Sequence, residues 1–88
     1  MMTKSWKVEI FIGERDGKTH AEARLFPSTR ATLTGVGDAR LNPVDWDVPE
    51  IGDELAAARA LSDLSHRLLE TAVDDIEGVT HEHVELTD

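Results

Sequence analysis

The chain has 88 residues, enough for one domain with a small hydrophobic core, and domains of this size often gain stability by oligomerising. Hydrophobic residues make up 40% and charged residues 31% of the chain, which excludes a disordered composition. Its 18 acidic and 9 basic residues give a net charge of −9, which disfavours the phosphate neutralisation behind non-specific nucleic-acid binding.

Three further absences in the sequence limit the class of protein. The chain contains no cysteine, so disulfides and thiolate chemistry are excluded. No apolar run approaches the ~18 residues that a membrane span needs. The first residues, 1–6, lack the apolar core of a secretory signal. We therefore expect a cytoplasmic protein that does not insert into a membrane.

The first half of the chain predicts a β-hairpin. Strands are expected at about 6–13 and 19–26. Trp6, Val8, Ile10 and Ile12 share one face of the first segment, which predicts a half-buried strand with these residues inward. Asp16-Gly17 lies between the two alternating runs and indicates a tight turn. In the second segment, by the same alternation, Ala21, Ala23 and Leu25 are expected to face the core.

A third strand is expected at about 31–41, after a turn at Pro27–Arg30. One face of it is a row of small residues with Gly35 and Gly37 at its centre. Close approach of a helix explains such a row better than a phosphate-binding loop. The reason is that Gly-x-Gly here lacks the third glycine and the following helix of a dinucleotide fingerprint.

A long amphipathic helix is expected at about 53–77, after a proline-containing connection at 42–50 and before a short tail at 79–88. Its apolar stripe recurs every three or four residues and includes Leu55, Ala58, Leu61, Leu64, Leu68, Ala72 and Ile76. Asp47 and Asp53 are alternative N-terminal caps, and Gly78 is the expected stop. The predicted fold is thus a single α+β domain over 1–88, a three-stranded antiparallel sheet (β-β-β-α) with the helix on one face.

The lengths of these elements predict self-association. A helix of about 25 residues is roughly 37 Å long, whereas strands of about eight residues span roughly 27 Å. The sheet therefore cannot cover the whole apolar stripe, and its unpaired edge adds a second exposed surface. We expect a homodimer in which a second copy covers these surfaces.

No catalytic or metal-binding constellation is recognised in the sequence, so we expect neither enzymatic activity nor a cofactor. The carboxylate pairs lie in predicted loops or at helix ends, where solvation opposes the raised pKa that general acid catalysis needs. His81 and His83 share a face of the tail, but two ligands form at most half of a metal site. We predict no metal site and leave metal binding by this pair open.

The order of elements resembles the double-stranded-RNA-binding-domain fold without its first helix. RNA-binding members of that fold carry a lysine cluster at the start of the last helix. Asp53 and Glu54 stand there in this chain, so direct duplex-RNA binding is disfavoured.

The chain is also similar to a small actinobacterial family of unknown function. The segments that carry this similarity are Trp6–Ile10, Gly35–Arg40, Ile51–Ala56, Ala58–Leu64 and Thr80–His81. The resemblance implies a dimer with a dsRBD-like fold, related by fold to ribosome hibernation-promoting factors and associated with stress and dormancy.

Two functions follow as hypotheses. The first is a non-enzymatic dimeric accessory protein of stress physiology that acts on the translation machinery, with the ribosome as a partner. The second is an acidic protein–protein interaction module without a nucleic-acid role. The candidate interaction surface is the sheet face away from the helix. Its expected members are Lys7, Phe11, Arg24, Phe26, Val36 and Arg40. Two alternatives remain for the basic residues of this surface. Glu9, Glu22 and Asp38 pair with them across the strands and neutralise them, or the basic residues form an unneutralised basic strip.

Overall fold

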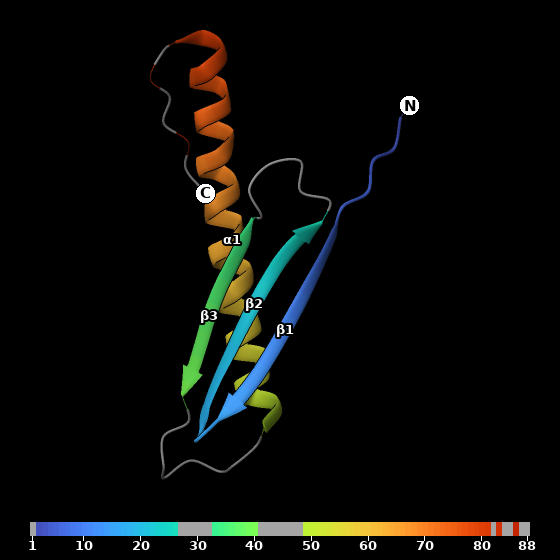
Figure 1. Ribbon diagram of the computed structural model, residues 1–88, viewed down its shortest axis with the longest axis vertical. Helices are drawn as coiled ribbons and strands as arrows, with labels where there is room; N and C mark the ends of the chain where they lie inside the picture. Colours follow the sequence, from blue (N-terminus) through green and yellow to red (C-terminus); the bar gives the residue numbers. More distant parts are fainter. Residues whose placement is uncertain (1, 27–32, 41–48, 82, 84–85, 87–88) are drawn as a thin grey trace.

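The computed structural model describes residues 2–26, 33–40 and 49–81, and residues 83 and 86 of the tail. Its elements are β1 (Lys7–Arg15), β2 (Lys18–Phe26), β3 (Thr34–Arg40) and α1 (Pro49–Thr80). The strands form one antiparallel sheet in the order β1-β2-β3, and α1 crosses one face of it (Figure 1). The predicted three-stranded α+β fold is therefore confirmed. The turn at 27–30 and residues 31, 32 and 41–48 lie outside the described residues.

The β1–β2 hairpin closes on a two-residue turn. Asp16 and Gly17 both have positive φ, 53° and 74°, and Arg15 stands opposite Lys18. Positive φ at both central residues is typical of a type I′ turn, whose twist matches that of the flanking strands. The Asp-Gly dipeptide thus sets the register of the whole hairpin, from Arg15↔Lys18 at the turn to Lys7↔Phe26 at the far end.

Helix α1 is longer at both ends than the sequence pattern indicates. It begins at Pro49, a residue suited to the first helical turn because proline lacks the amide hydrogen that would go unpaired there. Asp53 therefore lies inside the helix and is not its cap, while Asp47 is outside the described residues. The helix passes through Gly78 and ends at Thr80, where His81 adopts a φ of 61° and donates its N–H to the Glu77 carbonyl at 2.7 Å.

The core lies between α1 and the strands β2 and β3. Its buried hydrophobic residues are Ala21, Ala23, Leu25, Ala39, Ala56, Ala60 and Leu64. A Cβ atom on Gly35 would meet the backbone of Ala60 and Leu64, and one on Gly37 would meet the backbone of Ala56 and Ala60. The helix thus lies directly against β3, which confirms helix approach as the reason for the two glycines.

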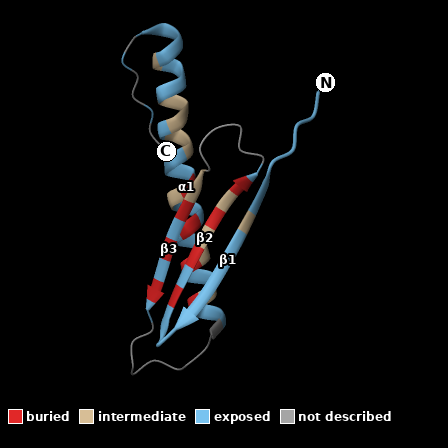
Figure 2. Cartoon of the chain, viewed as in Figure 1, coloured by how far each residue is buried: buried red, intermediate tan, exposed pale blue. Residues whose placement is uncertain are grey.

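The burial expected for β1 was wrong. Val8, Ile10 and Ile12 stand opposite Leu25, Ala23 and Ala21, so they do share the helix-side face of the sheet. They nevertheless keep 38% to 45% of their surface exposed. The reason is the position of α1, which packs on β3 and β2 and hardly reaches β1. Figure 2 shows β1 pale blue along almost its whole length, whereas red segments alternate along β2 and β3.

The helix extends well past the sheet (Figure 1). Its 32 residues span roughly 48 Å, against roughly 30 Å for a strand of 9 residues. The longest dimension of the molecule, 53 Å, is accordingly close to the length of the helix alone. The core contacts of α1 run from Ala56 to Leu68, and the turns after Leu68 project beyond the strands.

Candidate interaction surfaces

The two edges of the sheet differ, and the outer edge of β3 is closed by side chains of α1. The Val36 N–H donates to Asp63 Oδ2 at 2.8 Å, and Arg59 Nη1 donates to the Asp38 carbonyl oxygen at 2.6 Å. Arg67 Nε donates to the same Asp63 oxygen at 3.0 Å and fixes the carboxylate. An incoming strand would need the Val36 and Asp38 groups, so α1 blocks strand addition at this edge.

The same contacts shift the pKa of Asp63. The Val36 N–H, followed by the Arg67 guanidinium, stabilises the carboxylate and lowers the pKa of Asp63 below its ordinary value of 3.8. The contacts that close the β3 edge therefore favour the ionised form of Asp63. The sequence alone placed Arg59 and Arg67 on the helix but did not indicate that these residues and Asp63 contact the edge of β3. The hydrogen-bonded residues are 21 and 27 positions apart in the chain, and no local sequence pattern predicts such a contact.

The outer edge of β1 has no such cover from the described residues. In a hairpin with a two-residue turn, the two residues that flank the turn exchange two backbone hydrogen bonds with each other. Along the strands, every second pair of opposed residues does the same, and the residues between them direct their backbone groups away from the partner strand. Counting from Arg15↔Lys18, the backbone groups of Val8, Ile10 and Ile12 point away from β2. The side chains of these residues, exposed on the helix-side face, form what we call the β1 strip. It combines an unpaired edge with an uncovered apolar face.

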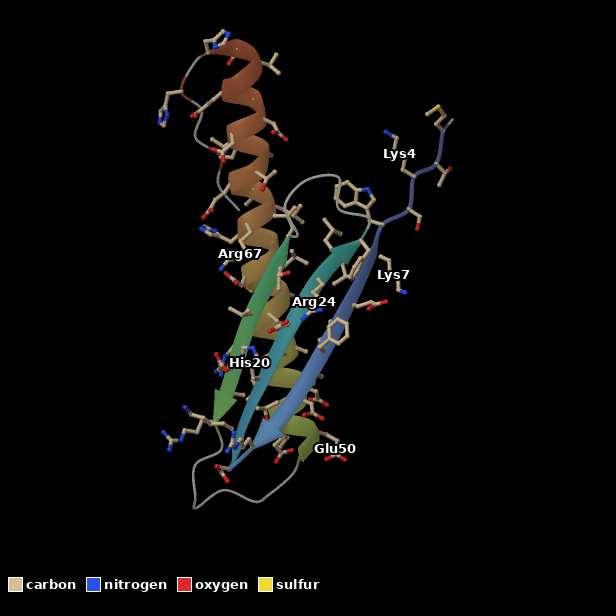
Figure 3. All side chains as sticks on the ribbon, viewed as in Figure 1. Lys4, Lys7, His20, Arg24, Glu50 and Arg67 are labelled. Carbon is tan, nitrogen blue, oxygen red and sulfur yellow. The ribbon has the colours of Figure 1, made fainter. Side chains whose placement is uncertain are left out.

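The opposite, outer face of the sheet carries the six residues named from the sequence. Phe11, Phe26 and Val36 are 45%, 38% and 42% exposed. Phe11 and Val36 stand in one cross-strand row with Glu22 between them, and Phe26 stands opposite Lys7 at the other end of the hairpin. The structure brings Arg24 (labelled in Figure 3) over the Phe11 ring, 4.5 Å from its centroid. Arg40 lies at the far end of β3, opposite Lys18.

Acidic neighbours occupy part of this face, mostly along the strands. Lys7 Nζ lies 2.6 Å from Glu9 Oε1, and Arg24 contacts Glu22 Oε2 through Nη2 and Nε at 2.7 and 3.2 Å. The expected cross-strand pairing of Glu9 and Glu22 with the basic residues was wrong, because each acid instead pairs with a base on its own strand. The hydrogen bond from the Arg24 guanidinium lowers the pKa of Glu22 and outweighs desolvation, which raises it.

Asp38 does pair across strands, but with a histidine. His20 Nδ1 lies 2.8 Å from Asp38 Oδ1, and His20 Nε2 lies 3.6 Å from Glu22. The hydrogen bond to Asp38 raises the pKa of His20 above 6.5. The hydrogen bond therefore favours the charged imidazolium of His20, which lies on the outer face of the sheet (Figure 3).

Three basic side chains form a row at the turn end of the outer face. Arg15 stands opposite Lys18, and Lys18 stands opposite Arg40. Like charges directly opposite one another on a sheet are destabilising, so this row has no folding rationale. Among the described residues, only Asp16 approaches it, 3.9 Å from Arg15. A shallow cavity of about 430 Å³ adjoins the row and is lined in part by Arg15, Lys18 and His20.

The charge of the molecule is divided between its two layers. Residues 1–40 contain seven Lys or Arg and five Asp or Glu, whereas residues 49–88 contain two and eleven. The sheet segment is therefore slightly basic, and the acidity of the chain comes from the helix and tail. A negative total charge does not by itself exclude a basic contact on the outer face.

The histidine pair of the tail is not gathered into a metal centre in the described part of the chain. His83 Nδ1 lies 3.1 Å from Glu77 Oε1, and His81 occupies the helix end. Across the described ranges, no group of three His, Cys, Asp or Glu side chains is placed to hold an ion. Within the same ranges no helix is long and apolar enough to cross a membrane.

These features define a small α+β domain in which the described residues close one sheet edge, leave the other open and expose apolar side chains on both faces of the sheet. Its sequence places it more narrowly. The chain belongs to the Rv2632c-like family, whose pattern matches residues 4–85. This bears out the resemblance to a small family of unknown function.

Relatives in mycobacteria share most of the chain. The uncharacterized protein Mb1767 of Mycobacterium bovis is 56% identical over 81 residues, 92% of this chain and 85% of that protein. The uncharacterized protein Rv2632c of Mycobacterium tuberculosis is 48% identical over 81 residues, 92% of this chain and 86% of that one. The crystal structure of Rv2632c superposes with a TM-score of 0.84 at 46% identity, covering 93% of this chain and 96% of that chain.

Proposed function

We infer that this protein is a non-enzymatic protein-interaction domain and that β1 is its principal contact element. The observation that carries this proposal is the exposure of the β1 strip, which leaves Val8, Ile10 and Ile12 uncovered beside an unpaired edge. Trp6, 65% exposed, immediately precedes it. Contiguous apolar surface at an open strand edge is typical of recognition by strand addition.

Site-specific photo-crosslinking in living cells tests this function. A benzophenone amino acid replaces Ile10 in the β1 strip, Phe11 on the outer face, or Glu54 on the exposed side of α1. We expect protein adducts from position 10, fewer from position 11, and none above background from position 54. Adducts that are equally frequent at all three positions, or absent from position 10, would contradict β1 as the contact element.

The translation machinery is a second candidate target, and the basic row favours it. Arg15, Lys18 and Arg40 place three positive charges together on an otherwise acidic protein. Such a row suits the phosphates of ribosomal RNA. A role in stress or dormancy would follow from binding to ribosomes of starved cells.

Co-sedimentation with ribosomes from growing and starved cells, over a salt series, tests this second candidate. Binding through phosphates falls steeply with salt, and Lys18→Glu with Arg40→Glu should abolish it. The control Lys4→Glu reverses one charge on an exposed residue ahead of β1, away from the row, and is compared with Lys18→Glu alone. Salt-insensitive binding would indicate a protein contact instead, and no binding in either preparation would exclude the translation role.

A further inference from the structure

We propose that the partner of the β1 strip is a second copy of this chain, added as an antiparallel strand with Ile10 on the two-fold axis. This proposal rests on the function inferred above and names the partner of the same surface. The resulting assembly is a continuous six-stranded sheet with the order β3-β2-β1 followed by the partner subunit's β1-β2-β3. Each step of the argument uses the residues of β1 and their described surroundings.

The described core of one copy consists mainly of small side chains, which favours burial of the strip in an assembly. Among the residues that the structure describes, five of the seven buried hydrophobic residues are alanine, and no large side chain is fully buried. Small domains compensate for such a core by oligomerising. The larger apolar side chains of β1 supply the missing buried surface when two copies meet.

The register with Ile10 on the axis opposes the three residues of the β1 strip to one another without opposing like charges. With Ile10 on the axis, Val8 faces the partner's Ile12 and Ile10 faces the partner's Ile10. On the other face, Glu9 stands opposite the partner's Phe11, and Lys7 opposite the partner's Gly13. Every pair from Lys7 to Gly13 thus falls inside β1 and leaves no like charges opposed.

The neighbouring registers fail on charge. Val8, Ile10 and Ile12 carry the backbone groups that point outward from the sheet. The partner strand can therefore slide only by steps that again pair these outward-pointing residues with one another. One such shift brings Lys7 opposite the partner's Arg15 and Val8 opposite the partner's Glu14. The shift in the other direction brings Glu9 opposite the partner's Glu9. Both shifts create a like-charge pair that the Ile10-centred register avoids.

The contact is also self-complementary, as a two-fold interface must be. A second copy offers the same edge and strip that it covers, so both copies bury Val8, Ile10 and Ile12 in one event. The closed β3 edge cannot take part, because Asp63 and Arg59 already occupy the Val36 and Asp38 groups. The only edge that the described residues leave open for pairing is therefore β1.

Disulfide trapping in this cysteine-free chain tests the register. Opposed residues of a hydrogen-bonded antiparallel pair have Cα atoms about 5.5 Å apart, within the range that a disulfide spans. Oxidised Ile10→Cys should therefore run almost entirely as a covalent dimer under non-reducing conditions. Phe11→Cys is the matched control, because its two copies lie on a diagonal of about 7–8 Å and should remain monomeric.

Sedimentation of Ile10→Lys supplies a second, independent measurement. Two ammonium groups would face each other on the axis, and we expect self-association to weaken at least about 100-fold. The control Val36→Lys, on the outer face of β3, should leave the dimer intact. Both positions are exposed in the single copy, so neither lysine is expected to unfold it.

Each result decides the proposal. Trapping at position 10 but not 11, with a monomeric Ile10→Lys, supports it. Trapping at position 11 alone overturns the register, and a dimer trapped at neither position overturns pairing through β1. A wild-type monomer also overturns it. In that case, photo-crosslinks from position 10 to another protein would leave the inferred interaction function standing.

Discussion

Gly35 and Gly37 fix the distance between the helix and the sheet. Because a Cβ on either residue would meet backbone atoms of α1, relief requires the whole helix to move. We expect Gly35→Ala or Gly37→Ala to lower the free energy of unfolding by about 3 kcal/mol. Urea denaturation measures this change. Gly13→Ala is the control, because nothing lies within 4 Å of its added Cβ, and a comparable loss there would contradict the packing argument.

Asp63 makes the closure of the β3 edge sensitive to acid. Its pKa is lowered in the folded state, so its contribution to stability is fully present above 3.8 and is lost as pH falls through the lowered value. We expect the protection factor of the Val36 amide, its slowing relative to the intrinsic exchange rate, to fall over that acidic range. Hydrogen exchange followed by NMR measures it.

The variant Asp63→Ala separates this effect from general acid unfolding. It should be less stable than the wild type at neutral pH, and the difference should shrink as the wild-type carboxylate becomes protonated. Glu54→Gln alters an exposed carboxylate of the same helix and should leave the Val36 amide unchanged. A difference between Asp63→Ala and wild type that stays constant down to low pH would rule out the carboxylate as the source.

At the scale of elements, the free end of α1 is the least supported part of the structure. Its last turn has no basic residue, and Asp74, Asp75 and Glu77 place negative charge where the helix dipole is already negative. We expect Asp74→Lys to stabilise the helix by about 0.5 kcal/mol, through the dipole and through Glu70 one turn earlier. Circular dichroism during thermal unfolding tests this, with Asp74→Asn expected to give a smaller gain.

The sequence predicted the elements well because each carries a strong local signal. The Asp16-Gly17 turn, the alternation in β2 and the small residues of β3 led to the correct pairing and the correct helix-side faces. The ends of α1 were missed because Pro49 was read as part of a loop and Gly78 as a stop. Helix propensity alone does not decide such positions.

The candidate surfaces were harder to predict. The outer-face residues followed from parity, and the structure places all six there. The exposure of the β1 strip could not be predicted, because alternation gives the face of a strand but not the lateral position of the helix that covers it. The closure of β3 by Asp63 and Arg59 depends on contacts between distant segments and has no local signal.

At the scale of the whole molecule, the overhanging helix makes the domain elongated. The Cα radius of gyration is 16.5 Å, against roughly 12 Å for a compact domain of this length. Small-angle X-ray scattering of the Ile10→Lys variant at low concentration should give a value close to the larger figure. A value near 12 Å would mean that the helix end folds back against the sheet in solution.

The closed β3 edge has a further consequence for how far assembly can proceed. Joining two copies through β1 uses both open edges and leaves a sheet whose two outer borders are β3 strands. Each border is sealed by the Asp63 and Arg59 of its own subunit. In the dimer proposed above, growth would therefore terminate at two subunits, and the side chains that hold the helix to the sheet would also oppose fibril formation.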